Sequence, residues 1–128
     1  MPSRERVQDF IATVESGRHV EAIEQFYAED ASMQENQAPP RRGRRNLMDG
    51  EQKVMESFEA IHTRPAEIVL IDGDRVVINW VFDFILADGR RFTFDELALQ
   101  LWSGDRIVEE RFYYDPGQRR PAAPAPGG

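Results

Sequence analysis

The stretch FYAEDASMQEN, residues 26–36, decides how this chain folds. Apolar residues recur at helical spacing on its N-terminal side, up to Phe26. The stretch itself is typical of a helix end that runs directly into a short strand, and Glu35 places a carboxylate at the end of that strand. We therefore predict a helix over about residues 18–27 and a strand that leads to Glu35.

Two further helices are predicted from the spacing of apolar residues. The first begins after Ser3, a good N-cap residue, and ends at Gly17 in the manner of a C′ glycine. Its buried face comprises Val7, Phe10, Ile11 and Val14. The last helix spans about residues 47–62, and Pro65 prevents its continuation. The apolar stripe of this helix comprises Val54, Met55, Phe58 and Ile61.

After Pro65 the hydrophobic period becomes strand-like. Four runs of β-branched or aromatic residues follow, at residues 68–71, 76–86, 91–102 and 107–114. Residues that favour hairpin turns separate these runs, at 72–74, 88–89 and 103–105. We predict an α+β fold in which three N-terminal helices pack on one face of a strongly curved, mostly antiparallel sheet.

The hairpins assign side chains to the two faces of the sheet. If residues 88–89 form a two-residue turn, Ala87 pairs with Arg90, and Trp80 lies opposite Leu97. One face is then strongly apolar, and we expect it to turn toward the helices. It comprises Ile78, Trp80, Phe82, Phe84, Leu97, Leu99 and Leu101.

The opposite face mixes polar and aromatic side chains. It carries Asn79, Asp83, Glu96, Gln100 and Trp102 together with Val77, Val81, Phe92 and Phe94. This face is too polar for a core and too aromatic to stay in water, which indicates a subunit interface. We predict a homodimer with contacts from Asn79, Val81, Phe94, Gln100 and Trp102.

The same register places a second carboxylate near the expected pocket. Continued through Gly104-Asp105, it puts Glu110 opposite Leu99 and Phe112 opposite Leu97, so that Glu110 points into the apolar face. A slip of one residue would send Glu110 outward. If Leu97 and Leu99 lie outside, the mixed face becomes the cavity wall, and Asp83 and Glu96 replace Glu110 as the candidate carboxylates.

Composition limits the classes of protein to which the chain can belong. Its 128 residues make one domain, and the net charge of −7 argues against a broad contact with nucleic acid or an anionic membrane. There is no cysteine, which excludes disulfides and thiol catalysis. Without a long apolar run or a signal-peptide core, we expect a cytoplasmic protein. We predict one domain over residues 1–115 and a disordered Pro/Gly/Ala-rich tail over residues 116–128.

Several of these segments together resemble the cone-shaped α+β family named for nuclear transport factor 2. That family includes ketosteroid isomerases, limonene epoxide hydrolases and polyketide cyclases of the SnoaL type. The resemblance rests on the turn at Gly17, residues 26–31, the loop at 39–43 and residues 103–108. It implies a conical pocket between the helices and the concave sheet face, where small apolar ligands bind.

The resemblance to the isomerases places Glu35 where their catalytic aspartate base stands. Their tyrosine donor falls on about Phe10, and their acid donor falls on Leu97 or Ala98. None of these side chains can donate a hydrogen bond to an enolate oxygen. The oxyanion hole of the isomerases is therefore not expected here.

The epoxide hydrolases resemble the chain without gaps over residues 28–44, but their catalytic residues are mostly missing. Their water-orienting tyrosine and asparagine fall on Met33 and Glu35. Of their Asp-Arg-Asp set, only Asp83 matches in residue type, and the predicted register points it away from the pocket. Epoxide hydrolysis by that set is not expected either.

We predict a pocket for a small, mostly apolar, carbonyl-bearing ligand, with Glu35 as general base and Glu110 as a second carboxylate. Ligand contacts are expected from Phe10, Tyr27, Met33, Phe58, Trp80, Phe82, Leu97, Leu99 and Phe112. No cofactor or metal is expected, because His19 and His62 lack partners at metal-ligand spacing. A non-catalytic ligand-binding protein and a protein-interaction module remain as alternatives.

Overall fold

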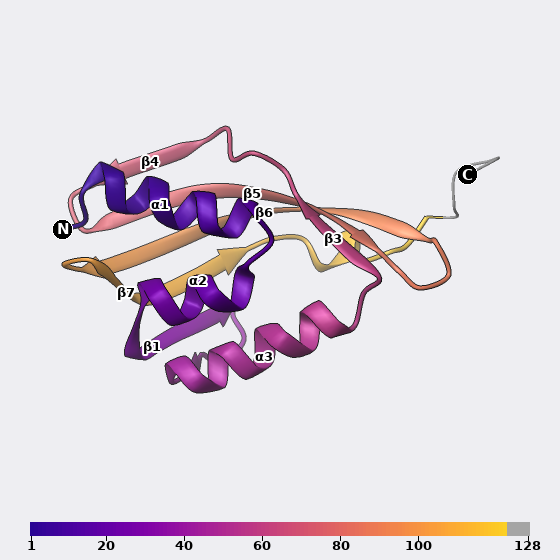
Figure 1. Cartoon of the computed structure of the whole chain (residues 1–128), viewed down its shortest axis with the longest axis horizontal. Coiled ribbons are helices and arrows are strands. Elements are labelled where there is room, and N and C mark those ends of the chain that lie inside the picture. The colour runs from indigo at the N-terminus through magenta and orange to yellow at the C-terminus, as the bar shows by residue number, and fades with distance from the viewer. Residues whose placement is uncertain (123–128) are drawn as a thin grey trace.

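In the computed structural model, which describes residues 1–122, three α-helices pack over one face of a curved sheet of seven strands (Figure 1). The helices are α1 (Arg4–Glu15), α2 (His19–Phe26) and α3 (Arg44–Glu56). The strands are β1 (Tyr27–Glu35), β2 (Arg41–Arg42), β3 (Ala60–Thr63), β4 (Val69–Asp72), β5 (Arg75–Ile85), β6 (Arg91–Ser103) and β7 (Arg106–Tyr113). The predicted α+β class is confirmed.

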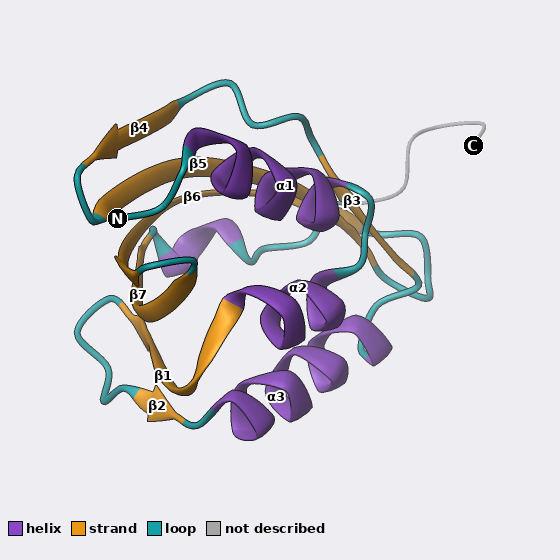
Figure 2. Ribbon diagram, turned by 60° about the vertical axis from the view of Figure 1, so that its left-hand side comes forward, coloured by secondary structure: helices purple, strands orange, loops and turns teal. Residues whose placement is uncertain are grey.

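The strand order is β2-β1-β7-β6-β5-β3, and β4 also pairs with β5. The β1–β7 pair is parallel, while every other strand pair of the described residues is antiparallel. β4 pairs with residues 75–78 of β5, and β3 pairs with residues 82–85 of the same strand. Figure 2 shows β5 and β6 curving behind α1, so that the concave side of the sheet faces the helices.

The first two helices follow the sequence prediction. The Ser3 side chain accepts a hydrogen bond from the Arg6 backbone N–H at 3.0 Å, which caps the start of α1. Gly17 has a φ of +88°, a left-handed conformation that glycine adopts without strain, and it lies just beyond the end of α1. α2 then runs directly into β1 at Tyr27, as the decisive stretch predicted.

The last helix is shorter than predicted. α3 ends at Glu56, where the N–H of Ser57 bonds to two carbonyl groups of the final turn. Residues 60–63 form β3 instead, because their backbone groups pair with β5. Phe58 therefore lies beyond the helix and packs on Phe84, with ring centroids 4.8 Å apart. In this segment, pairing with a strand that is distant in sequence outweighs the helical spacing of the apolar residues.

The β5–β6 hairpin differs from the prediction by one residue. The N–H of Leu86 bonds to the carbonyl oxygen of Arg90 at 2.8 Å, so the loop contains three residues, 87–89, rather than two. Its last residue, Gly89, has a φ of +85°, as a three-residue hairpin loop requires. Trp80 consequently pairs with Glu96.

This change exchanges the two faces of β6. Leu97 is 45% exposed, and Leu99 and Leu101 lie on the same outer face by strand alternation. Phe94, Gln100 and Trp102, predicted for a dimer interface, are buried on the inner face. The predicted orientation of β6 is therefore wrong, whereas Trp80 and Phe82 on β5 do face the helices, as predicted.

The turn between β6 and β7 is the predicted two-residue turn, with Ser103 paired to Arg106. A β-bulge next to Trp102 then shifts the later pairs by one residue, so that Glu110 lies opposite Gln100 and not opposite Leu99. The two shifts compensate each other. Glu110 points toward the helices, as predicted, and is only 2% exposed.

The segment after β7 continues along the sheet. Residues Pro116–Gln118 form a 3₁₀ helix, and the side-chain amide of Gln118 exchanges two hydrogen bonds of 2.9 Å with the backbone of Asp95. Ala122 forms an isolated bridge with Arg91. The structure thus gives residues 116–122, predicted as part of a disordered tail, contacts with the free edge of β6. Residues 123–128 lie outside the described residues.

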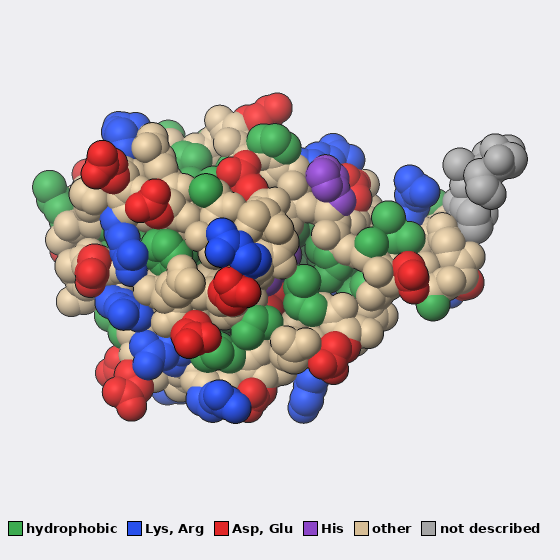
Figure 3. Space-filling view, viewed as in Figure 1, with side chains coloured by type: hydrophobic (Ala, Val, Ile, Leu, Met, Phe, Trp, Pro, Cys, Tyr) green, Lys and Arg blue, Asp and Glu red, His purple; other side chains and the backbone are tan. Residues whose placement is uncertain are grey.

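None of the helices within residues 1–122 is long and apolar enough to cross a membrane. Figure 3 shows acidic and basic side chains interspersed over the face it presents, with hydrophobic side chains at the surface between α3 and β3.

Candidate functional site

A cavity of about 290 Å³ lies between the helices and the concave sheet face. Its apolar wall comprises Phe10, Val14, Ala22, Ile23, Met33, Val54, Ile61, Trp80, Phe82, Phe84, Phe94 and Phe112. Its polar and charged side chains are His19, Tyr27, Glu35, Arg41, Glu51, Glu96, Glu110 and Arg119. A cavity of this size is at the lower end of the range for small-molecule sites.

The structure brings most of the predicted site residues to this cavity. Phe10, Tyr27, Met33, Glu35, Trp80, Phe82, Glu110 and Phe112 line it. Phe58 does not line the cavity, because it packs against Phe84 and Phe92. Leu97 and Leu99 are on the outer face of β6, so their predicted role as ligand contacts is corrected.

Glu110 lies at the centre of a chain of buried hydrogen bonds. Tyr27 donates its hydroxyl hydrogen to one carboxyl oxygen, and the Gln100 side-chain amide donates to the other at 2.6 Å. The indole N–H of Trp102 donates to the side-chain oxygen of Gln100 at 3.0 Å and fixes the orientation of that side-chain amide. Because each of these polar atoms has a partner, the chain holds the Glu110 carboxyl group in one place.

Burial raises the pKa of Glu110 to about 7, although the hydrogen bonds from Gln100 and Tyr27 favour the ionised form and oppose the rise. Glu51 raises the Glu110 pKa further by charge repulsion. Burial and the adjacent Glu110 also raise the pKa of Tyr27 well above its usual value. A carboxyl group that titrates near neutral pH can both take up and release a proton under physiological conditions.

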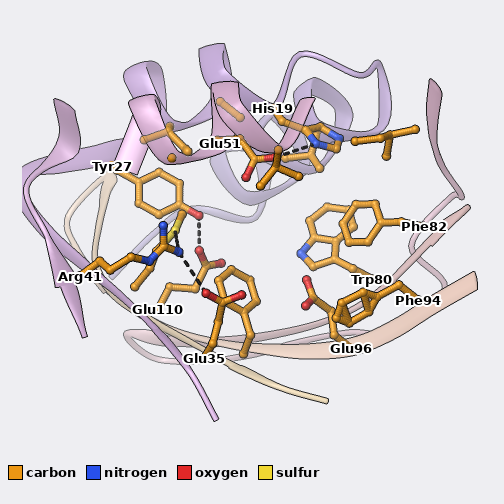
Figure 4. A pocket seen from close by; sticks show the side chains of 18 of the residues that line it. His19, Tyr27, Glu35, Arg41, Glu51, Trp80, Phe82, Phe94, Glu96 and Glu110 are labelled. Atoms are coloured by element: carbon orange, nitrogen blue, oxygen red, sulfur yellow. Dashed lines mark hydrogen bonds and ion pairs between the residues drawn. The ribbon is translucent and has the colours of Figure 1, made fainter. Parts of the chain in front are cut away.

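Glu35 lies at the side of the pocket where Arg41 approaches it (Figure 4). Its side chain is 36% exposed and forms an ion pair with Arg41 at 3.2 Å. The Tyr114 hydroxyl donates to the other carboxyl oxygen of Glu35 at 3.3 Å. The structure thus places Glu35 at the end of β1 beside the pocket, as the sequence indicated, with two protein partners already in contact.

Glu96 is a pocket carboxyl group that the predicted register turned away from the helices. It lies directly across from Trp80 on the inner face and makes no side-chain hydrogen bond or ion pair within residues 1–122. Burial, and then repulsion from Glu110, raise its pKa well above the usual value. No local sequence signal could have placed it, because Asp88-Gly89 suits a two-residue hairpin loop as well as a three-residue one. Asp83, the other carboxylate proposed for that case, pairs with Arg64 outside the cavity.

His19 and Glu51 form the helical side of the pocket. The His19 Nδ1 atom lies 3.2 Å from a Glu51 carboxyl oxygen, and its Nε2 atom lies 2.9 Å from the Thr63 hydroxyl group. Each ring nitrogen therefore has a protein partner, which ties α2 to α3 and β3. Nothing in the spacing of the sequence indicated this contact, because it joins three separate elements. Within residues 1–122, no group of three or more His, Cys, Asp or Glu residues could hold a metal ion.

Fold and pocket together define a cone-shaped α+β protein with its cavity on the concave side of the sheet. The model of the SnoaL-like domain matches residues 7–110, and the chain belongs to this SnoaL-like family. The predicted resemblance to nuclear transport factor 2-like proteins is thereby confirmed. A comparison with curated protein sequences finds no match.

Solved structures give the same result for the fold. A candidate SnoaL-like polyketide cyclase from Mesorhizobium loti is 28% identical, with a TM-score of 0.72 over 86% of this chain and 97% of that chain. A protein with a ketosteroid isomerase-like fold from Catenulispora acidiphila, in complex with trimethylamine, is 19% identical, with a TM-score of 0.75 over 91% and 89% of the two chains. A candidate polyketide cyclase from Xanthomonas campestris is 20% identical, with a TM-score of 0.74 over 87% and 88%. The last two likenesses concern the fold alone.

Proposed function

We propose that this SnoaL-like protein catalyses proton transfer on a small, mostly apolar compound that bears a carbonyl group, with Glu110 as the general base and without a cofactor. The observation that supports this proposal best is the position of Glu110. Its carboxyl group is buried in the wall of an aromatic cavity, has a pKa of about 7 and is held by Tyr27 and Gln100. These are the properties that a general base at neutral pH requires.

The proposed step begins when the Glu110 carboxylate removes a proton from the carbon next to the substrate carbonyl group. The electron pair of the broken C–H bond moves into the carbonyl group and gives an enolate. If the substrate also has a C=C bond conjugated with the enolate, the enolate takes the proton back from Glu110 at another carbon, which is isomerisation. Alternatively, the enolate carbon attacks a second carbonyl group, whose oxygen receives the bond's electron pair and the proton from Glu110, which is ring closure. Trp80 offers a donor for the enolate oxygen, since its indole N–H faces the cavity and bonds to no acceptor in the described part of the chain (Figure 4).

In this proposal Glu35 has a secondary role. The sequence pointed to Glu35 as the base because it matches the position of the isomerase aspartate. Its ion pair with Arg41 and its exposure of 36% keep it in a more water-like environment than Glu110. We infer that Glu35 and Arg41 orient the substrate at the pocket entrance, and that a Glu35→Gln variant loses less than about tenfold in rate.

The proposal can be tested before the natural substrate is known. Ketones such as acetophenone, cyclohexanone and α-tetralone exchange their α-protons slowly in neutral D₂O, and NMR follows the exchange directly. The protein is expected to accelerate the exchange of at least one of these ketones at pH 7–8, because a bound ketone lies beside Glu110. If a ketone binds in the cavity and its exchange stays at the uncatalysed rate, the catalytic proposal is wrong.

One observation favours a second candidate function, non-catalytic binding of a small ligand. Both Glu110 carboxyl oxygens already accept a hydrogen bond, from Tyr27 and from Gln100, which would suit a group that only shapes the pocket. The same NMR experiment separates the two candidates, because a binding protein shifts the ligand resonances without exchanging protons.

We also propose that the protein is a cytoplasmic homodimer and that its interface is the outer sheet face. The corrected register removes Phe94, Gln100 and Trp102 from this face but leaves Asn79 and Val81 and adds the leucines at 97, 99 and 101. An apolar row of this kind favours a two-fold contact.

The dimer proposal predicts that wild-type protein has the mass of two chains in light scattering at micromolar concentration. Leu97→Arg is expected to give the mass of one chain with an unchanged circular dichroism spectrum, because this side chain is 45% exposed within the protomer. Gln52→Arg on the exposed surface of α3 serves as the control and should remain dimeric. A wild-type mass of one chain would contradict the proposal.

A further inference from the structure

We propose that the pocket binds a cation, namely a ligand with a protonated or quaternary amine whose alkyl groups pack on the aromatic wall and whose charge is balanced by Glu96. This names the class of ligand for the pocket of the proposed function and rests on that pocket being the ligand site. The inference follows from the partners of the pocket carboxyl groups and from the side chains around Glu96.

Three of the four carboxyl groups that line the cavity have partners in the protein. They are Glu35 with Arg41, Glu51 with His19, and Glu110 with Tyr27 and Gln100. Glu96 is the exception among the described residues, and Figure 4 shows its carboxyl group directed into the cavity. A carboxyl group in an apolar cavity is costly when it is ionised and unpaired, so a cation bound beside Glu96 would stabilise its ionised form.

The wall around Glu96 is aromatic. Trp80 is its cross-strand partner, and the neighbouring pair on the same face is Phe82 with Phe94. The rings of Trp80 and Phe82 are stacked with centroids 6.0 Å apart, and Phe10 approaches Trp80 at 6.2 Å. Aromatic faces attract cations, and alkylated ammonium groups in particular bind in pockets that combine such faces with a carboxylate.

The charged groups that face Glu96 come from four segments of the chain. Glu35 of β1, Glu51 of α3 and Glu110 of β7 all repel its ionised form, and Arg119 of the C-terminal segment opposes them. The Arg119 guanidinium is positioned over the rings of Phe94 and Tyr114, at 4.9 and 5.7 Å from their centroids. Four carboxyl groups and two arginines line the cavity, and this excess of acidic groups favours a cationic ligand over an anionic one.

The size of the cavity fits a small amine. A volume of about 290 Å³ holds a trialkylammonium group together with a short apolar or carbonyl-bearing arm. Because Glu96 on β6 and Glu110 on β7 line the same cavity, one small molecule could place its ammonium group at Glu96 and its reacting carbon at Glu110.

The experiment compares choline with 3,3-dimethyl-1-butanol, its neutral isostere in which carbon replaces the nitrogen. Isothermal titration of the full chain at pH 7 is expected to show at least roughly tenfold tighter binding of choline, because shape and apolar area are the same and only the charge differs. Binding is also expected to release protons from Glu96, which titrations in two buffers of different ionisation enthalpy detect.

The Glu96→Gln variant is expected to lose the preference for choline and to keep its affinity for the neutral alcohol, which shows that the cavity is intact. Glu109→Gln, on the exposed side of β7, is the matched control and should retain the preference. Equal affinities of wild-type protein for the two probes, no choline binding at millimolar concentration, or an unchanged preference in Glu96→Gln would each overturn the proposal. The ketone exchange assay measures catalysis independently of choline binding. The catalytic proposal and the cation-binding proposal can therefore each fail without the other.

Discussion

Glu110→Gln is expected to lower the rate of α-proton exchange on a bound ketone by roughly 10²-fold or more. Glutamine has nearly the same shape and can still accept the hydrogen bond from Tyr27, but it cannot take up a proton. One contact is lost, because the Gln100 amide group would meet another amide donor or must rotate. Ligand affinity is therefore the first control, and it should change much less than the rate.

The pH dependence of the rate identifies the titrating group. In wild-type protein the exchange rate should rise with pH through a midpoint near pH 7 and level off above about pH 8, because Glu110 acts as a base only when it has lost its proton. Glu35→Gln should keep this profile and lose less than about tenfold in rate, since Glu35 lies at the solvated side of the pocket. A profile with the same midpoint in Glu110→Gln would assign the titration to another group.

The elements that the sequence predicted correctly depend on short-range patterns. The Ser3 cap, the left-handed Gly17 and the apolar spacing between them determine α1 without any contribution from distant parts of the chain. The four long β-runs were also found, because alternation and turn residues mark their ends. The family resemblance followed from the same local segments, and the SnoaL-like match over residues 7–110 confirms it.

The orientation of β6 could not be settled locally. Asp88-Gly89 suits either a two-residue or a three-residue loop, and the choice moves every β6 side chain to the opposite face. The three-residue loop is the one that buries two side chains of β6. Trp102 is 1% exposed, and Gln100 is fully buried in contact with Glu110. A polar glutamine is buried here because Glu110 and Trp102 satisfy its amide group, and this contact cannot be read from any single segment.

The candidate site could be predicted only in part, because the face of each β6 side chain depends on a hairpin loop that the local sequence does not determine. Phe10 and Tyr27 were found because their own elements were assigned correctly, whereas Glu110 was placed inward because the hairpin error and the β-bulge compensate each other. The predicted β5–β6 register, which is wrong by one residue, placed Glu96 on the face away from the helices. Arg119 was assigned to a disordered tail. Both residues lie next to the free edge of β6, where segments that are distant in sequence meet.

Wild-type protein is expected to lose stability as the pH rises from about 4.5 to 8. Glu110 has a pKa of about 7 in the folded protein against 4.5 for the free side chain, so the folded state binds its proton more tightly than the unfolded state. The stabilisation is therefore fully present below pH 4.5 and is lost as the pH passes through 7, by about 3 kcal/mol for this residue. The raised pKa of Glu96 acts in the same direction.

Chemical unfolding at a series of pH values measures this loss. Glu110→Gln should have a shallower pH dependence than wild type, and the double variant Glu110→Gln/Glu96→Gln should be nearly flat above pH 5, because neither amide titrates. The lowered pKa values of Asp83, due to Arg64, and of Asp88, due to the Arg90 backbone, act in the opposite direction but below this range. A wild-type free energy of unfolding that stays level or rises between pH 5 and 8 would show that Glu110 is ionised without penalty. The raised pKa that suits Glu110 to act as a base at neutral pH would then be contradicted.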